Sequence, residues 1–527
     1  MSTNKKRYAD IILEIIPRLL SSLDTNKHSH TFGCFDKAYW LYKTSDIPCA
    51  RFQEPVLTLA LLYSYSFNGN IYYRNERIRE YAIAGIRFLS KIQNRDGSFN
   101  EWYPNEHSYV GTAFPLYFVS EAFRTLELKN DKLVKAFSKG GNWLGKTKDE
   151  EQPSNQVAGA IAALHNIYVI TGDERYRKLA DRKLRGIKQS VEGWFPEYGG
   201  PDLGYLTLTI DFLAKYWKDS KNKRALQRLE SALSFLKYFI HPDGSLGGVY
   251  GSRNTEFKVP YGLEILSKQN RDADYAARMI YENIERTLNP SMMDERFALQ
   301  YHSSYLQAFL ENLRNREVKE SRTLKLDSTK LFKDSGLFVH NNGRYYFISN
   351  LKKAGVFRLF KNNGEQVCDD SGIVCSLGKD TLATQWNDSS EYRINGNKTN
   401  ISGKFVRLCP TQRLSPQKNI LLRSILLTMG NVSHSAIKKM FRKKLIKAAR
   451  KTGIVYEREI ELQGDRVIVT DDIKNPHGLE LKNIHLSSGF VSPYVPTAHF
   501  FKKSDIIAPE KVGLKLSDFP VKRTYRL

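Results

Sequence analysis

The sequence predicts a ring of paired helices, an (α/α)6 toroid, over residues 1–315, followed by an antiparallel β-sandwich domain over residues 316–527. Two observations lead to this prediction. A glycine turn and the helices on either side of it recur about every 50 residues in the first part, whereas short runs with period-two alternation fill the second. A chain of 527 residues is long enough for one large repeat-built domain and a smaller partner.

The recurring turn is the clearest sign of repetition. Three segments leave a helical pattern, turn at Gly97, Gly193 or Gly244, and enter a new apolar helix through a loop rich in Gly, Pro and aromatic residues. In the first two segments a Glu follows the glycine by four residues and a Tyr follows it by twelve; these residues are Glu101, Tyr109, Glu197 and Tyr205.

Two kinds of helix are expected around these loops. Apolar helices should begin near residues 53, 107, 155, 205, 255 and 299. Amphipathic, more polar helices should occupy about 8–22, 76–95, 131–145, 176–190, 223–240 and 272–288. Hairpins of this length bury their apolar faces only against neighbouring hairpins, so the pattern favours a closed toroid, with an open solenoid as the alternative.

Beyond about residue 315 the pattern changes to that of antiparallel strands. Runs such as 336–351 and 456–473 alternate or cluster β-branched and aromatic residues between Asn-Gly and Gly-Asp turns. A segment at 436–451 interrupts them with eight basic and no acidic residues, and predicts a basic helix. This helix either packs on the sheet or docks on an anionic membrane surface or a polyanion. The basic residues proposed to contact a membrane are Lys438, Lys439, Arg442, Lys443 and Lys447.

The charge balance limits the partners. The chain has 81 Lys and Arg against 56 Asp and Glu, a net charge of +25, which favours polyanions. Nucleic acid is not expected as a partner because the basic residues are not interleaved with a base-reading module. Five cysteines without metal-ligand spacing predict no metal site, and no cofactor is expected. No export signal or membrane-spanning run is seen, which predicts a cytoplasmic protein, at most peripheral at the inner membrane face.

Three segments resemble the heparinase II/III-like family of polysaccharide lyases. YEREIELQGDRVIVTDDI looks like a strand-turn-strand late in that family's sheet domain, and SGLFVHNNGRYYFISNL followed by CDDSG looks like its opening strands. GCFDKAYWLYKTSDIPCARFQEPVLTLALLY is similar to a segment of heparinase-like proteins from surface-polysaccharide clusters. The resemblance implies a toroid with a sheet domain, and β-elimination on a uronate-containing acidic polysaccharide.

The resemblance also implies catalytic residues. Asn155, at the start of an apolar helix, matches the amide that neutralises the substrate carboxylate, and Tyr205, one repeat later, matches the catalytic tyrosine. Helix capping by Asn155 and core packing by Tyr205 are the structural alternatives. His107, where a loop meets an apolar helix, is the candidate acid or base, or else a capping or core histidine.

Further rim residues are candidates for substrate binding. Gln156 adjoins Asn155, Arg253 would bind a carboxylate, and His302 lies on the sixth apolar helix. Glu101 and Glu197 would orient the histidine or hold the loops by accepting backbone hydrogen bonds. The remaining candidates are aromatic residues of the same loops that would stack on sugar rings or pack on one another: Trp102, Trp194 and Tyr109.

One departure from the family leaves two functions open. Active members carry a His-rich segment in the sheet domain, but the corresponding stretch 349–360 has no histidine, and Lys352 or Lys353 would fill only the electrostatic part of that role. The chain is therefore either a lyase of an acidic polysaccharide or a non-catalytic protein of surface-polysaccharide biosynthesis at the cytoplasmic membrane face.

Overall fold

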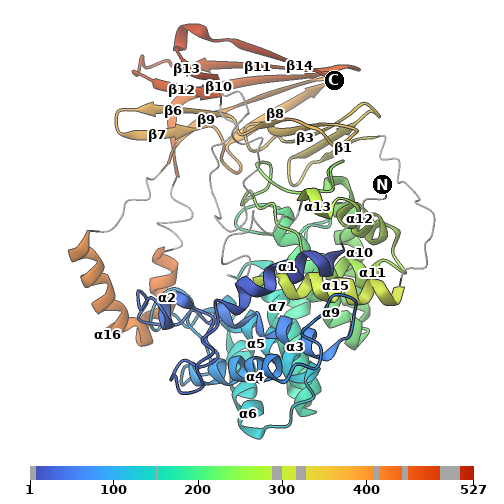
Figure 1. The fold of residues 1–527 in the computed structure, drawn as a ribbon. Helices are drawn as coiled ribbons and strands as arrows, with labels where there is room; N and C mark the ends of the chain where they lie inside the picture. Colours follow the sequence, from blue (N-terminus) through green and yellow to red (C-terminus); the bar gives the residue numbers. More distant parts are fainter. Residues whose placement is uncertain are drawn as a thin grey trace.

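The computed structural model describes residues 7–149, 152–287, 300–315, 328–408, 415–441, 449–486 and 511–527. It confirms the predicted fold class, because a helical ring is followed by antiparallel sheets (Figure 1). Among the described residues, the last helix of the ring ends at Asn315 and the first strand begins at Ser328.

An inner layer of helices closes the ring. It consists of α3 (Val56–Ser64), α5 (Tyr109–Thr125), α7 (Ser154–Thr171), α9 (Leu203–Ser220), α11 (Tyr261–Leu266) and α15 (His302–Asn315). Each packs on the next, and α15 packs back on α3, so the arrangement is a toroid and not an open solenoid. These helices are largely apolar because they are surrounded by other helices.

An outer layer of amphipathic helices covers the ring. It consists of α1 (Tyr8–Leu20), α4 (Glu76–Lys91), α6 (Asp131–Lys146), α8 (Glu174–Gly186), α10 (Lys223–Leu236) and α12 (Arg271–Glu282). From α4 onward each begins after an Asn or Asp whose side chain accepts backbone N–H groups of the first turn: Asn75, Asn130, Asp173, Asn222 and Asn270. The remaining short helices are α2 (Lys37–Trp40), α13 (Ile284–Thr287) and the 3-10 turns η1 (Ala50–Gln53), η2 (Lys237–Phe239) and η6 (Leu516–Asp518).

The recurring glycines mark a close approach of two backbones. Gly97 and Gly193 have φ angles of +101° and +103°. A Cβ atom added to Gly97 would lie 2.3 Å from the Lys139 carbonyl oxygen of α6, and one added to Gly193 would lie 2.2 Å from the Ser231 carbonyl oxygen of α10. Gly244 is in the same position against α12. The repeat therefore needs glycine both for the backbone angle and for the contact.

Two antiparallel sheets form the second domain. The first has the order β1-β2-β3-β4-β5, and the second the order β13-β12-β6-β7-β9-β10-β11-β14, with β8 paired to β9. The first sheet comprises β1 (Ser328–Phe332), β2 (Leu337–Asn341), β3 (Tyr345–Asn350), β4 (Val356–Lys361) and β5 (Gln366–Asp370). The second comprises β6 (Ile373–Leu377), β7 (Asp380–Ala383), β8 (Ser390–Asn395), β9 (Lys398–Leu408), β10 (Ala449–Leu462), β11 (Arg466–Lys474), β12 (Lys482–Leu486), β13 (Lys511–Leu514) and β14 (Val521–Arg526).

The first sheet is covered on both faces. On one face Tyr345, Phe347 and Phe357 join the core shared with the second sheet. On the other face Tyr346 and Phe360 join the core of the toroid. Alternate residues of a strand point to opposite faces, so a strand covered on both sides is expected to be mostly apolar. Strand β3 is buried along its whole length, and its first four residues are aromatic or aliphatic.

A buried ionic cluster ties the two sheets together. Arg458 donates to Asp471 at 2.6 Å and to Asp370 at 2.9 Å. Arg523 donates to Asp370 at 2.6 Å and to Asp471 at 2.5 Å. Burial by itself would raise the pKa of Asp370, but the two guanidinium groups outweigh it and lower the pKa to about 2.

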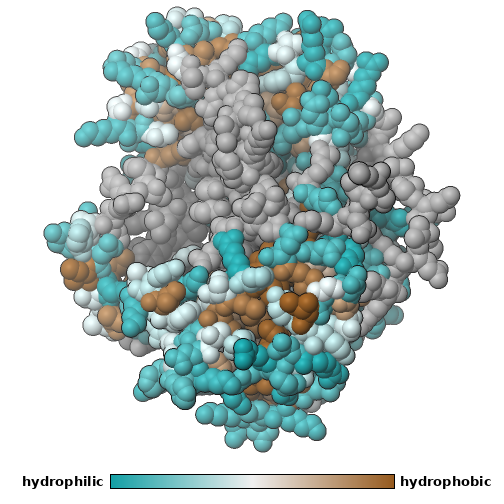
Figure 2. Space-filling view, in the orientation of Figure 1, coloured by the Kyte–Doolittle hydropathy of each residue, from teal (hydrophilic) through white to brown (hydrophobic). Residues whose placement is uncertain are grey.

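The predicted basic helix at 436–451 is wrong in its bounds. The helix in this region, α16 (Pro416–Phe441), begins about 20 residues earlier, and residues 449–451 begin strand β10. Lys438 and Lys439 lie near the end of α16, whereas Arg442, Lys443 and Lys447 lie outside the described residues. The exposed apolar side chains of α16 lie earlier in the helix, with Ile420 68% and Leu421 62% exposed, and apolar atoms are visible there in Figure 2. Among the described helices, none combines the length and apolar character needed to cross a membrane.

Candidate functional site

The first turn of α7 carries a buried amide–carboxyl pair. The Asn155 backbone N–H and its Nδ2 group both donate to Glu197, to Oε1 and Oε2 respectively, each at 2.8 Å. Asn155 therefore does not cap its own helix; it joins α7 to the loop that follows Gly193. Both side chains are buried.

Burial determines the charge of this pair. It raises the pKa of Glu197 to about 8, with a further contribution from the nearby Asp202, and outweighs the opposing hydrogen bonds from Asn155 and the charge of Arg253. At neutral pH Glu197 is thus mostly uncharged. The positive charge of Arg253 is consequently left available to another anion.

Asp202 joins the start of α9 to the loop that carries Arg253. It is the N-cap of α9 and accepts from the Tyr205 N–H at 3.3 Å. It also accepts from the Arg253 N–H at 2.9 Å and from Thr255. A buried carboxylate that satisfies backbone donors of both segments fixes Arg253 beside Tyr205.

Tyr205 and Arg253 carry the polar groups of this cluster that have no partner. The guanidinium carbon of Arg253 lies 4.8 Å from the centre of the Tyr198 ring, and the Tyr198 and Tyr205 ring centres are 6.4 Å apart. Both Tyr205 and Arg253 are half-buried. Within the described residues, Arg253 forms no ion pair, its Nε is buried without a hydrogen bond, and the Tyr205 hydroxyl has no hydrogen-bond partner. Burial raises the pKa of Tyr205 well above its usual range, although the Arg253 charge opposes this.

The sheet domain holds the Arg253 loop from the other side. Lys353 Nζ donates to the carbonyl oxygens of Val249 and Gly251 at 2.8 and 2.7 Å, and to Asn254 Oδ1 at 2.6 Å. Asn387 Nδ2 donates to the Ser252 carbonyl oxygen at 3.1 Å. Burial lowers the pKa of Lys353 to about 7. This lysine therefore positions the loop that the sheet domain contacts, whereas Lys352 points to the Asp334 carbonyl oxygen at 2.9 Å.

A second polar group lies near the start of α5. Arg51 of η1 pairs with Glu54 at 2.7 Å and lies 3.9 Å from Glu101. Its guanidinium carbon is 4.9 Å from the centre of the Phe114 ring. The nearby Glu54, Tyr301 and Glu101 outweigh the effect of burial and raise the pKa of Arg51 well above its usual range, and Tyr301 also contributes to the raised pKa of Tyr205.

His107 is engaged within its own loop. Its Nδ1 lies 2.7 Å from Asp96 Oδ2 and 2.8 Å from Ser98 Oγ, and its backbone N–H donates to Asn100 at 3.1 Å. These contacts join the Gly97 turn to the start of α5. The catalytic role of His107 stays a prediction, but its side chain faces the turn and has a structural function there.

The other predicted residues are spread over the toroid. Tyr109 donates to Asp149 at 2.7 Å, beside the outer helix α8, and Trp194 donates to Glu192 at 3.1 Å. Trp102 is 62% exposed, and Gln156 is half-buried in the first turn of α7. His302 is buried, has no hydrogen-bond partner among the described residues, and has its pKa lowered to about 3 by burial. Their roles in substrate binding stay predictions.

The structure thus brings Asn155, Glu197, Tyr205 and Arg253 into one cluster, to which Asp202, Tyr198 and Lys353 also belong. We call these seven residues the rim cluster. It lies where the inner helices α7 and α9 begin, on the side of the ring that faces the sheets (Figure 1). Asp202 follows a Gly-Gly-Pro stretch directly before the predicted helix, a signal that could have identified it as an N-cap. Nothing in the sequence indicates that Tyr198 lies under Arg253.

Among the described residues, no group of three or more His, Cys, Asp or Glu side chains is arranged to hold a metal ion. The rim cluster instead offers one unpaired cation, one free phenol and a mostly neutral carboxyl. Such a set can bind an anion and transfer a proton beside it.

The fold, a helical toroid followed by an antiparallel sandwich, is shared with known polysaccharide lyases. No family model matches the chain, and no curated protein matches it. The chain is similar to a chondroitin AC lyase of Streptomyces coelicolor A3, solved in complex with chondroitin sulphate, with 12% identity and a TM-score of 0.58 over 93% of this chain and 69% of that one. Weaker similarities include the heparan sulfate lyase HepC of Pedobacter heparinus (10% identity, TM-score 0.39, 91% and 71% of the chains) and a sugar epimerase from a ruminal bacterium (13%, 0.42, 59% and 100%).

Proposed function

We propose that the protein acts on an acidic polysaccharide and that the rim cluster binds a uronate unit. The observation that carries this proposal is the pair of half-buried, unpartnered groups at Arg253 and Tyr205. A guanidinium group left without an ion pair suits a planar carboxylate, because its fork of N–H donors matches the two carboxylate oxygens. The structural similarity to a chondroitin AC lyase supports a carbohydrate ligand.

The finer proposal is a lyase reaction by β-elimination. Arg253 would neutralise the uronate carboxylate and so acidify the C5 proton, while the Asn155–Glu197 pair holds the loop behind it. Tyr205, as its phenolate, would take the C5 proton and return it to the 4-oxygen as the bond to the leaving sugar breaks. Burial keeps most of Tyr205 protonated near neutrality, so the reaction rate should rise with pH from about 6 until Glu197 loses its proton at a pH of about 8.

The test is an absorbance assay for 4,5-unsaturated uronate with a panel of glycosaminoglycans and bacterial uronate polymers. Tyr205→Phe should lower the turnover rate by two to four orders of magnitude, as expected for loss of the proton-transfer group. Arg253→Met should weaken binding and also lower the turnover rate, because the C5 proton of the bound uronate is then less acidic. Tyr168→Phe, at the opposite end of α7, and Arg87→Met, on the outer helix α4, are matched controls that should retain wild-type activity. Full activity of Tyr205→Phe on a cleaved polymer would refute the assignment.

A non-catalytic protein that binds such a glycan during its synthesis is the second candidate. It is favoured by the engagement of His107 with Asp96 and by the presence of a buried lysine, Lys353, where active lyases of the resembled family carry histidines. This candidate predicts no absorbance change with any polymer, together with salt-sensitive binding that Arg253→Met weakens.

A further inference from the structure

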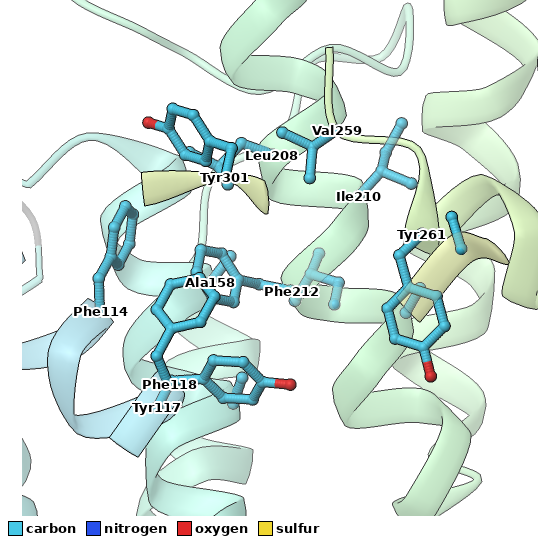
Figure 3. Close-up of a cluster of buried hydrophobic side chains, with 14 of the residues drawn as sticks. Phe114, Tyr117, Phe118, Ala158, Leu208, Ile210, Phe212, Val259, Tyr261 and Tyr301 are labelled. Atoms are coloured by element: carbon cyan, nitrogen blue, oxygen red, sulfur yellow. The ribbon is translucent and has the colours of Figure 1, made fainter. Parts of the chain in front are cut away.

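A polar cavity lies inside the toroid, away from the rim cluster. It has a volume of about 80 Å³ and is lined by the inner helices α5, α7, α9, α11 and α15. In Figure 3 the side chains of Phe114 and Phe212 lie between Tyr301 on one side and Tyr117 and Tyr261 on the other. Tyr117 and Tyr261 line the cavity, whereas Tyr301 lies near Tyr205 of the rim cluster. An aromatic layer therefore separates the cavity from the rim cluster.

Two buried polar side chains in the lining lack hydrogen-bond partners among the described residues. They are His165 at both ring nitrogens and Gln307 at Oε1. A third, Lys215, has an ionic contact with one carboxylate but no well-aligned hydrogen bond to it. The exposed fractions of His165, Lys215 and Gln307 are only 5%, 7% and 7%. An unsatisfied buried polar group costs about 1–3 kcal/mol, so His165 and Gln307 in one small cavity indicate a missing partner.

Lys215 is the charged group at the centre of this set. Its Nζ is 2.6 Å from Asp211 Oδ2 and lies over the rings of Tyr117 and Tyr261, at 4.9 and 5.6 Å from their centres. Asp211 also accepts from the Gly262 N–H at 3.0 Å and from Ser304 at 3.1 Å. The carboxylate is therefore shared among three donors, and the ammonium group has N–H bonds left for a ligand.

The other charges of the lining are mutually satisfied. Arg124 donates to Glu121 and to Asp219, each at 3.0 Å, and Lys218 donates to Glu311 at 2.6 Å. Arg124 and Lys218 are in the last turns of α5 and α9, where cations offset the helix dipole. The chemistry open to a ligand is thus set by Lys215, His165 and Gln307.

These three residues and the cavity volume define a ligand class. Lys215 and the N–H of a neutral His165 donate, and burial lowers the pKa of His165, which favours that neutral form. Gln307 Oε1 accepts. A volume of about 80 Å³ corresponds to about five to eight waters at ~10–15 Å³ each. A carboxylate for the donors and a hydroxyl for the acceptor, on a molecule of this size, would give a partner to Lys215, to the N–H of His165 and to Gln307 Oε1.

We propose that this cavity is a binding site for a small hydroxycarboxylate, with the carboxylate on Lys215 and His165 and a hydroxyl on Gln307. The site is separate from the rim cluster, so it does not depend on the polysaccharide activity. Aromatic rings on two sides of Lys215 exclude water and strengthen the ionic contact.

The experiment is calorimetric titration of the full chain with sodium glycerate at pH 7, with glycerol and sodium propionate as matched probes that lack the charge or the hydroxyl. Titrations are repeated with Arg253→Met, in order to remove any carboxylate binding at the rim. Glycerate should bind Arg253→Met as it binds the wild type, and at least tenfold more tightly than glycerol does.

Variants of the lining decide the outcome. Lys215→Met should weaken glycerate binding at least tenfold, and Gln307→Leu should abolish the preference for glycerate over propionate. If Lys215→Met does not fold, Gln307→Leu carries the test. Glycerate binding no tighter than glycerol binding, binding that disappears in Arg253→Met, or equal affinities in wild type and Gln307→Leu would each overturn the proposal in favour of a cavity filled by water.

Discussion

The buried carboxyl of Glu197 should make the stability of the toroid depend on pH in an unusual direction. In the folded protein this group keeps its proton up to a pH of about 8, whereas a free Glu side chain loses it near 4.5. Between these values the folded state binds more protons than the unfolded state, so raising the pH favours unfolding. Each pH step of one costs about 1.4 kcal/mol, and the free energy of unfolding should fall by about 5 kcal/mol across the interval.

Glu197→Gln should remove this slope. An amide does not titrate, and it can exchange two hydrogen bonds with Asn155 once the Asn155 side-chain amide is flipped, which is why the variant should fold. The assay is urea unfolding at pH 5, 6, 7 and 8 followed by tryptophan fluorescence, since five of the six tryptophans precede residue 316 and report on the toroid.

Glu192→Gln, in the same loop, is the matched control and should keep the wild-type slope. The informative quantity is the difference in unfolding free energy between wild type and variant at each pH, because other titrating groups cancel. Parallel curves for wild type and Glu197→Gln between pH 5 and 8 would refute the argument that this carboxyl is protonated in the fold.

Three further results are expected from the packing. Gly193→Ala should lower the unfolding free energy by roughly 2 kcal/mol or more, because the added methyl group meets a backbone carbonyl at a positive φ angle. Gly186→Ala, with open space around it, should be neutral or stabilising. Equal melting temperatures for the two variants would contradict this expectation. Asp471→Ala should cost about 3–5 kcal/mol by leaving buried guanidinium groups underpaired, and Asp472→Ala, on the opposite face of the strand, much less, as measured by urea unfolding. Because the pKa of Asp370 is lowered to about 2, the contribution of this carboxylate to stability should be present above pH 4 and be lost as the pH falls from 4 to 2. Circular dichroism during an acid titration would detect this loss, and Asp370→Asn should not show it.

The fold could be predicted from the sequence because certain positions of its repeat accept only one type of residue. A turn with a positive φ angle against a neighbouring helix admits only glycine, so the turns at 97, 193 and 244 appear directly in the sequence. The asparagine and aspartate caps of the outer helices repeat with similar regularity, and they would have placed the helix starts within a residue or two.

The candidate site could be predicted only in part, because it depends on the orientation of each side chain and on its hydrogen-bond partners. Asn155, Glu197, Tyr205 and Arg253 could be named from their repeat positions, but their hydrogen bonds could not. His107 occupies an equally suitable position and turns back to Asp96. The sequence predicts a helix in this region only from residue 436, whereas α16 begins at Pro416. The first half of α16, with exposed Ile420 and Leu421, lacks the apolar stripe that marks a packed helix.

The doubly covered first sheet has a consequence for how the chain can be divided. Its Tyr346 and Phe360 face belongs to the hydrophobic interior of the helical ring, and its Phe347 and Phe357 face to that of the strands behind it. If the toroid or the sheet domain were expressed alone, it would expose a broad apolar surface to water and should aggregate. The two halves are expected to melt together, as one cooperative unit, and truncation is a poor route to a minimal fragment of this protein.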